Sequence, residues 1–289
     1  MRWDQGAAVG DGDQTGRTIV TGGAFQLKTG KGTMSYAALM VYYDASSKAQ
    51  ARIRLAVGLA DRFQTALIGI AGPPYLPAAS ANVTDALAEI ERNFRDAARP
   101  IRNVEWRGGP IWAGILVPQE ARAADLVIVG PAPEPRDLSY SHHPGTIILG
   151  AGRPVLFVPD RVDKLAARRI VVAWRDSRES RRAVRDALPF LRNAEEVMIV
   201  EVCEQAPESR TSIDDVGDYL LRHKVTVKAK AYLHAQRSVA DEILRFAREQ
   251  DSDLIVAGGY GHSMLGEWFF GGVTRDLLAN ASLCCLFSN

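Results

Sequence analysis

Apolar residues along this chain follow two patterns, which alternate from one segment to the next. Short continuous apolar runs, such as 126–129 and 254–257, are typical of strands buried on both faces. Between them lie longer segments, such as 46–63 and 178–192, in which apolar residues recur with the period of a helix. Strands that alternate with helices predict right-handed crossovers and a parallel sheet covered on both faces.

The pattern places a definite series of elements in each half of the chain. In the first half we expect strands at 37–43, 65–71, 102–107, 125–129 and 154–158, with helices at 46–63, 82–98, within 110–123 and at about 144–151. In the second half we expect strands at 169–174, 197–203, 225–233, 253–257 and 283–288, with helices at 178–192, 212–223, 238–250 and 272–281.

The two halves repeat one another. Ser46 and Ser177 each follow an apolar run at a helix start, and the helices behind them carry the same apolar stripe at a constant offset. In the second half, Asp176 and Glu179 form the pattern of a capping box with the aspartate as cap. We therefore expect two α/β domains, at 36–160 and 166–289, joined by a short polar junction.

One strand indicates the order of strands in the sheet. The segment 225–233 alternates apolar and polar positions, and Lys228 and Lys230 lie on one side of it. A strand with one solvent-exposed face that carries lysines is expected at the edge of a sheet, where the charge discourages pairing with other chains. The third strand of a five-stranded sheet of order 3-2-1-4-5 lies at such an edge, so we expect that order in each half.

Residues 1–35 differ from the rest of the chain. They are rich in glycine and polar residues, have no sustained periodicity and lack the apolar core of a secretory signal. We expect a disordered leader here, with Met34 as the start of the natural protein.

Composition and charge exclude several classes of partner. The formal net charge is +1, which gives no electrostatic reason for binding nucleic acid or an anionic membrane. No apolar run approaches the length of a membrane span. The three cysteines, Cys203, Cys284 and Cys285, do not form a disulfide framework, and successive side chains of the pair point to opposite faces of a strand. These features favour a soluble protein of the reducing cytoplasm.

The candidate chemistry lies near the C-terminus. A buried strand at 253–257 leads into Gly258 and Gly261, and Gly271 and Gly272 precede the helix at 272–281. Backbone N–H groups of such a loop can close on an anion because no Cβ intervenes, and the helix start adds partial positive charge. A glycine-rich turn that only lets the chain reverse is the alternative reading of these residues.

The spacing Gly-x2-Gly-x9-Gly, the duplicated layout and the start motif of Asp44 and Ser46 together resemble a tandem member of the universal stress protein family. The resemblance implies two flavodoxin-like domains of the adenine nucleotide alpha hydrolase type. It also implies a site for ATP between the end of the first strand and the glycine loop. Members of the family often pair through their last strands, which implies a homo-oligomer or, in a tandem chain, an intrachain pseudo-dimer.

The two halves match different parts of the family's binding motif. In the first half Asp44 matches the family's aspartate at the end of the first strand, but Gly130 is followed by prolines from Pro131 onward in place of a glycine loop. We therefore expect a nucleotide only in the second half. There the candidate binding residues are Gly258, Gly261, Gly271, Gly272, Thr274, Arg175, Asp176 and Val202.

The second half departs from the family pattern at two of these positions. Gly272 stands where the family has a serine or threonine, so the nearest hydroxyl belongs to Thr274. Arg175 stands at the aspartate position, with Asp176 one step on. Arg175 either pairs with a phosphate or stacks on a base, or it is a solvated loop residue.

Catalytic motifs are missing from the sequence. Gly-x-Ser-x-Gly does not occur, and no cluster of cysteine, histidine or carboxylate residues has the spacing of a metal site. We read His142 and His143 as a solvated turn, and the aromatic residues at 268–270 as covering the loop or facing a partner more readily than a ligand. We expect a stress-response protein that binds ATP or a relative and is not an enzyme; the alternatives are an interaction or scaffold protein without a nucleotide, and a weak ATPase.

Overall fold

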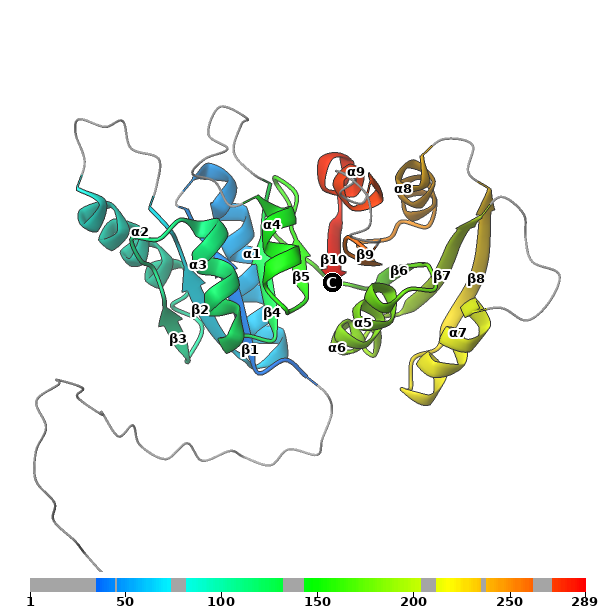
Figure 1. Cartoon of the computed structure of the whole chain (residues 1–289). Helices are drawn as coiled ribbons and strands as arrows, with labels where there is room; N and C mark the ends of the chain where they lie inside the picture. The colour runs from blue at the N-terminus through cyan, green and yellow to red at the C-terminus, as the bar shows by residue number, and fades with distance from the viewer. Residues whose placement is uncertain are drawn as a thin grey trace, which may run out of the picture. The chain divides into compact units, whose positions relative to one another are not determined.

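The structure is a computed structural model that describes residues 35–44, 46–73, 82–131, 143–203, 212–234, 238–261 and 272–289. Residues from Met34 to Asn289 form one compact unit, coloured from blue to red in Figure 1. The expected leader lies outside the described residues up to residue 34. Among the helices of the described ranges, none has the length and apolar character needed to cross a bilayer.

The elements follow the predicted order closely. The first half contains β1 (Ala38–Tyr42), α1 (Ser47–Phe63), β2 (Ala66–Ile70), α2 (Val83–Ala97), β3 (Val104–Trp106), α3 (Ala113–Glu120), η1 (Ala121–Ala123), β4 (Leu126–Val129), α4 (Pro144–Gly150) and β5 (Val155–Phe157). The second half contains β6 (Arg169–Trp174), α5 (Arg178–Asp186), α6 (Leu188–Leu191), β7 (Glu196–Cys203), α7 (Ser212–Arg222), β8 (Val227–His234), α8 (Val239–Glu249), β9 (Leu254–Gly258), α9 (Gly272–Asn280) and β10 (Cys284–Ser288).

All these strands lie in one ten-stranded sheet of order β3-β2-β1-β4-β5-β10-β9-β6-β7-β8. Each half therefore has the predicted order 3-2-1-4-5, and its neighbouring strands are parallel. The halves meet where β5 and β10 pair antiparallel, with Cys285 opposite Phe157 and Leu286 opposite Leu156. The pairing of last strands implied by the resemblance thus occurs within the chain.

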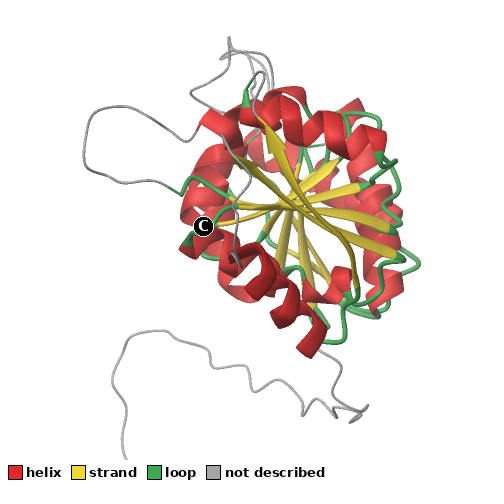
Figure 2. Cartoon of the chain, turned by 90° about the vertical axis from the view of Figure 1, so that its right-hand side faces the viewer, coloured by secondary structure: helices red, strands yellow, loops and turns green. Residues whose placement is uncertain are grey.

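Helices cover both faces of the sheet, as Figure 2 shows. Residues of α1, α2, α5, α6 and α7 pack into the core of one face, and residues of α3, α4, α8 and α9 into the core of the other. Because successive residues of a strand point to opposite faces, Cys284 joins the first core and Cys285 the second. The predicted opposite orientation of the cysteine pair is confirmed.

The N-terminal residues of α1 and α5 show that one predicted cap is wrong. Ser46 and Ser177 are the N-caps of α1 and α5, and the Ser177 hydroxyl accepts a hydrogen bond from the N–H of Ser180 at 3.2 Å. The capping box with Asp176 in the cap role is therefore wrong, because the serine one step later reaches the free N–H. The predicted helix 178–192 is also divided into α5 and α6, since Pro189 has no N–H to continue the ladder.

The two edges of the sheet are protected by charge. At one edge β8 is half-exposed, as predicted; Lys228 pairs with Glu196 at 2.8 Å and Lys230 with Asp214 at 2.7 Å. Edge pairing with other chains is thereby discouraged.

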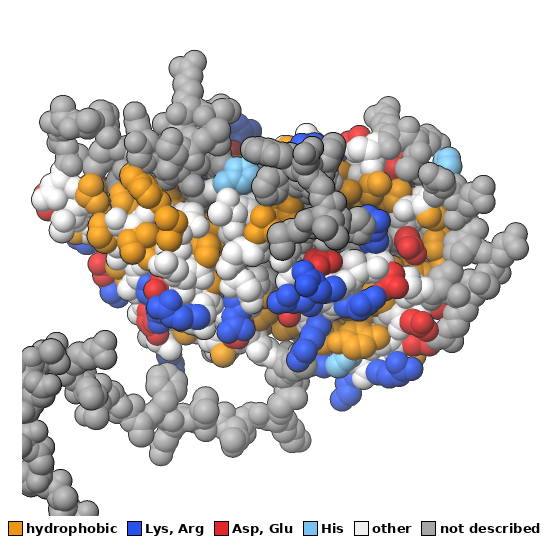
Figure 3. Space-filling view, in the orientation of Figure 1, with side chains coloured by type: hydrophobic (Ala, Val, Ile, Leu, Met, Phe, Trp, Pro, Cys, Tyr) orange, Lys and Arg blue, Asp and Glu red, His pale blue; other side chains and the backbone are white. Residues whose placement is uncertain are grey.

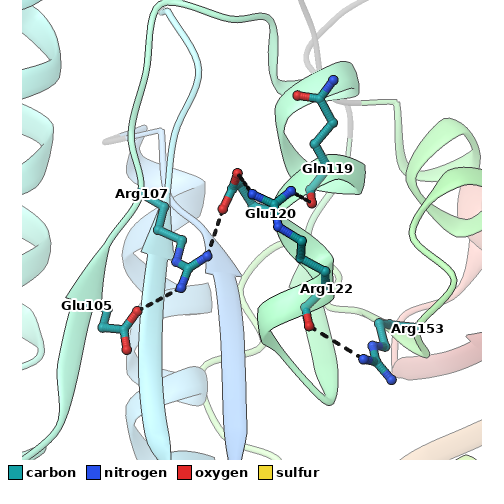
Figure 4. Close-up of polar contacts among 6 residues, drawn as sticks. All are labelled: Glu105, Arg107, Gln119, Glu120, Arg122 and Arg153. Atoms are coloured by element: carbon teal, nitrogen blue, oxygen red, sulfur yellow. Dashed lines mark hydrogen bonds and ion pairs between the residues drawn. The ribbon is translucent and has the colours of Figure 1, made fainter. Parts of the chain in front are cut away.

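At the other edge, Arg107 lies just beyond β3 and donates to Glu105 at 3.1 Å and to Glu120, at the end of α3, at 2.8 Å, as Figure 4 shows. Arg122 completes the group by donating to the second oxygen of Glu120 and to the carbonyl of Gln119. The network fixes α3 to the short edge strand.

Candidate functional site

A cavity of about 570 Å³ opens at the carboxyl ends of β6, β7 and β9. The strand β6 lies between β7 and β9, so the chain leaves β6 toward β7 on one side and later crosses from β8 to β9 on the other. Such a switch point is where open α/β sheets bind their ligands. The described residues that line the cavity include the apolar side chains of Ala173, Val200, Val202, Val239, Ile243 and Ala257.

The glycines of the predicted loop allow the close approach of other elements. A Cβ on Gly258 would lie 2.8 Å from the backbone nitrogen of Ser180, so glycine lets the start of α5 pack on the end of β9. A Cβ on Gly261 would meet the carboxylate of Glu179. For Gly272, at the start of α9, no atom of the described residues lies within 4 Å of such a Cβ.

Thr274 stabilises the segment that follows β9. Its side chain is buried, and its hydroxyl oxygen accepts a hydrogen bond from the N–H of Tyr260 at 3.1 Å. Tyr260 has a φ of 54°, in the left-handed region that non-glycine residues seldom adopt. The hydrogen bond therefore connects a strained loop residue to the first turn of α9.

Glu179 is a functional candidate that the sequence did not reveal. It lies in the first turn of α5, is 7% exposed and accepts a hydrogen bond from Nε of Arg178 at 2.7 Å. Burial acts to raise the pKa of its carboxyl, but Arg178, its own backbone N–H and Ser177 outweigh burial and leave the pKa below its usual value. The cavity thus contains an ionised carboxylate. The available sequence signal was its position two residues after the cap Ser177, which places it in the first turn beside the strand ends.

A second carboxylate lines the same cavity. Glu201 lies near the end of β7, and burial together with the nearby Asp176 raises its pKa. Arg175 is the guanidinium among the described lining residues. Basic side chains also gather in the region of α5 in Figure 3; this helix contains Arg178, Arg181, Arg182 and Arg185.

The structure brings most of the predicted binding residues together. Those that line the cavity are Gly258, Gly261, Gly272, Thr274, Arg175 and Val202. Asp176 is elsewhere: its carboxylate accepts a hydrogen bond from Arg181 at 2.6 Å and lines a second cavity of about 380 Å³ between α5 and α7. Gly271 and the aromatic residues 268–270 lie outside the described residues.

The remaining sequence candidates have structural roles. The Nδ1 atom of His143 accepts a hydrogen bond from the N–H of Gly145 at 3.2 Å and caps α4, while His142 lies outside the described residues. In the first half, Asp44 accepts hydrogen bonds from the N–H and the hydroxyl of Ser46, at 3.1 and 2.7 Å. Within the described ranges, no group of three histidine, cysteine or acidic residues has the arrangement of a metal site.

Comparisons with known proteins concern the family and the fold. Residues 166–286 match the model of the Universal stress protein family. No curated protein matches the chain in sequence.

Among solved structures, a universal stress protein from Archaeoglobus fulgidus DSM 4304 is similar, with a TM-score of 0.70 and 12% identity over 87% of this chain and 96% of that chain. A protein from Pseudomonas aeruginosa UCBPP-PA14, described as a universal stress protein, has a TM-score of 0.57 and 14% identity over 88% of this chain and 93% of that chain. At these identities the likeness is one of fold, and it extends over both halves.

Proposed function

We propose that the protein is a universal stress protein that binds ATP or a related nucleotide in the cavity of its second half, since residues 166–286 match the model of that family. One observation carries this proposal. The cavity lies at the switch point between β6 and β9, and its wall contains Gly258, Gly261 and Gly272, at which glycine leaves the backbone accessible or allows close packing.

The lining suits the parts of a nucleotide. The apolar ends of β6 and β7, with Val239 and Ile243 of α8, offer a surface for a base. The first turn of α9 at Gly272 has N–H groups without a partner inside the helix, and together with the partial positive charge of the helix start these suit a phosphate. We assign Val202 to the base and Arg175 to a phosphate, with Thr274 as the residue that positions the loop.

We propose that binding, and not turnover, is the activity. The ligand would stabilise the second half and bias an interaction surface during a stress response in the cytoplasm. The polar groups assigned to the site hold and orient a nucleotide, and none of them is placed as a nucleophile paired with a base.

An interaction protein of the same fold without a nucleotide is the second candidate. The observation that favours it is the carboxylate of Glu179, which brings negative charge to the wall where a phosphate would bind. In that case the fold alone would serve as a docking scaffold.

Isothermal titration calorimetry with ATP and with adenosine monophosphate separates the two candidates. We compare the full chain with Gly272→Asp, which adds a carboxylate at the start of α9, and with Gly109→Asp, which adds one in the first half. At both glycines a new Cβ meets no described atom within 4 Å. We expect saturable binding by the wild type and Gly109→Asp, and affinity weakened about tenfold in Gly272→Asp because the added charge repels phosphate. A folded wild-type protein without saturable binding of either ligand at about 1 mM would favour the scaffold.

A further inference from the structure

The proposed function leaves the buried carboxylate of Glu179 without a role. The start of α5 is held against β9 because Gly258 packs on the backbone of Ser180. This packing sets the position of Glu179, whose Oε2 atom lies against Gly261. The carboxylate therefore faces the part of the loop whose N–H groups would otherwise receive an anion.

The charge of this carboxylate is fixed in place. Its Oε1 atom accepts the hydrogen bond from Arg178, and the first turn of α5 favours a negative side chain. The guanidinium of Arg178 is on the outer side, where its side chain is 73% exposed and solvent screens it, while the side chain of Glu179 is only 9% exposed. The carboxylate of Glu179 therefore lies on the cavity wall, whereas the guanidinium of Arg178, which carries the opposite charge, is exposed to solvent.

The other charges around the cavity do not reverse this balance. Arg175 and Glu201 also line it, so the described wall carries two carboxylates and one guanidinium. The equivalent of Glu179 in the first half is Lys48, which is exposed and pairs with Asp160 at 2.7 Å. The two halves therefore differ in sign at this position.

We infer that Glu179 determines which nucleotides the cavity accepts, favouring adenosine and nucleotides with few phosphate charges over ATP. The inference rests on the proposed function and refines it. A phosphate at Gly261 would stand within a few ångströms of the carboxylate, and like charges at a partly buried site repel strongly. A ribose hydroxyl placed there would instead donate a charge-assisted hydrogen bond to the carboxylate.

The test is a ligand series measured by calorimetry in EDTA, with adenosine, adenosine monophosphate and ATP. For the wild type we expect affinity to fall in that order. In Glu179→Gln, which keeps the shape and removes the charge, we expect ATP affinity to rise about tenfold and adenosine affinity to stay level or fall.

Glu242→Gln is the matched control. Glu242 is 3% exposed, lies near the start of α8 and pairs with Arg245 at 2.8 Å, but it does not line the cavity. We expect this variant to keep the wild-type order and affinities.

Two results would overturn the inference in distinguishable ways. If the wild type binds ATP more tightly than adenosine, and Glu179→Gln leaves the affinities unchanged, Glu179 does not select the ligand although nucleotide binding stands. If neither folded protein binds any of the three ligands, the proposed function fails and the inference fails with it. If Glu179→Gln does not fold, a wild type that binds ATP more tightly than adenosine still contradicts the inference.

Discussion

The guanidinium of Arg52 fills the space that a side chain on Gly130 would need. A Cβ on Gly130 would come closer than 3.0 Å to Nη1 of Arg52. Arg52 is buried, and its Nε atom donates to the carbonyl of Tyr42 at 2.7 Å. Gly130 follows β4 as Gly258 ends β9, but a buried guanidinium approaches the first glycine, whereas the start of α5 approaches the second. The halves share a fold and differ in what packs against this glycine.

This arrangement predicts that Arg52→Ala is strongly destabilising. The substitution removes the hydrogen bond from Arg52 to the Tyr42 carbonyl and opens an internal void, so we expect the free energy of unfolding to fall by about 3 kcal/mol. Arg52→Met, which restores most of the volume, is expected to lose about half as much. Urea denaturation of the full chain measures both values.

Arg54 provides the control on the same helix. Its side chain is 59% exposed and pairs with Asp163 at 3.3 Å, so Arg54→Ala is expected to change the free energy of unfolding by less than about 1 kcal/mol. Equal losses in Arg52→Ala and Arg54→Ala would show that the buried guanidinium has no special part in the first half.

A second prediction concerns the packing of α5 on β9. In Gly258→Ala the new Cβ meets backbone, which cannot move aside as a flexible side chain does, so we expect a loss of about 2 kcal/mol or more. In Gly272→Ala the new Cβ meets no atom of the described ranges within 4 Å, so we expect the free energy of unfolding to stay within about 0.5 kcal/mol of the wild type. Thermal unfolding compares the two; similar melting temperatures would argue against the close approach.

The edge network predicts a dependence of stability on pH. The hydrogen bond from Arg107 lowers the pKa of Glu120 against the opposing effect of burial, and the charge of Arg122 lowers it further. Because the folded pKa lies below the unfolded one, the stabilisation is present above the unfolded pKa and is lost as pH falls through the folded pKa. We expect the difference in unfolding free energy between wild type and Glu120→Gln to shrink as pH falls from 7 to about 3.

A matched variant for this experiment is Glu91→Gln, which breaks the exposed pair of Glu91 and Arg95 on α2. Exposed pairs contribute little, so its difference from the wild type is expected to stay small at every pH. A Glu120→Gln difference that stays constant between pH 7 and about 3 would contradict the role assigned to the network.

The cysteines predict a labelling pattern. Burial raises the pKa of the Cys284 thiol to about 12 and raises that of Cys285 still further, so both remain thiols in the folded protein. We expect iodoacetamide to label the half-exposed Cys203 in the folded chain, and Cys284 and Cys285 only after unfolding. Mass spectrometry of digested samples measures the labelling of each cysteine. Rapid labelling of Cys285 in the folded chain would contradict the burial of β10.

Most of the fold could be predicted because apolar periodicity reports local structure and burial together. The strand at 169–174 has the predicted bounds, and the helix at 272–280 ends one residue before the predicted position. The edge position of β8 followed from its lysines. The division of α5 from α6 was missed because the apolar stripe continues through Pro189 and hides the lost hydrogen bond.

From the sequence we could predict only those parts of the site whose residues lie close together in the chain. Gly258 and Gly261 flank the end of one strand, so their spacing placed them correctly on the wall of a cavity. The contact of Glu179 with Gly261 joins positions far apart in the chain, and no local pattern encodes it. Asp176 was assigned with its neighbour Arg175, yet the structure directs it toward α7 and Arg181. Arg52 was missed because an arginine in a helix pattern reads as exposed.

The most direct test of the central claim is a crystal structure of the full chain grown with adenosine monophosphate. The account predicts electron density for the ligand in the cavity of the second half, with its base against the ends of β6 and β7 and its phosphate toward the start of α9. Density only at another place, or an empty cavity at a saturating concentration of the nucleotide, would contradict it.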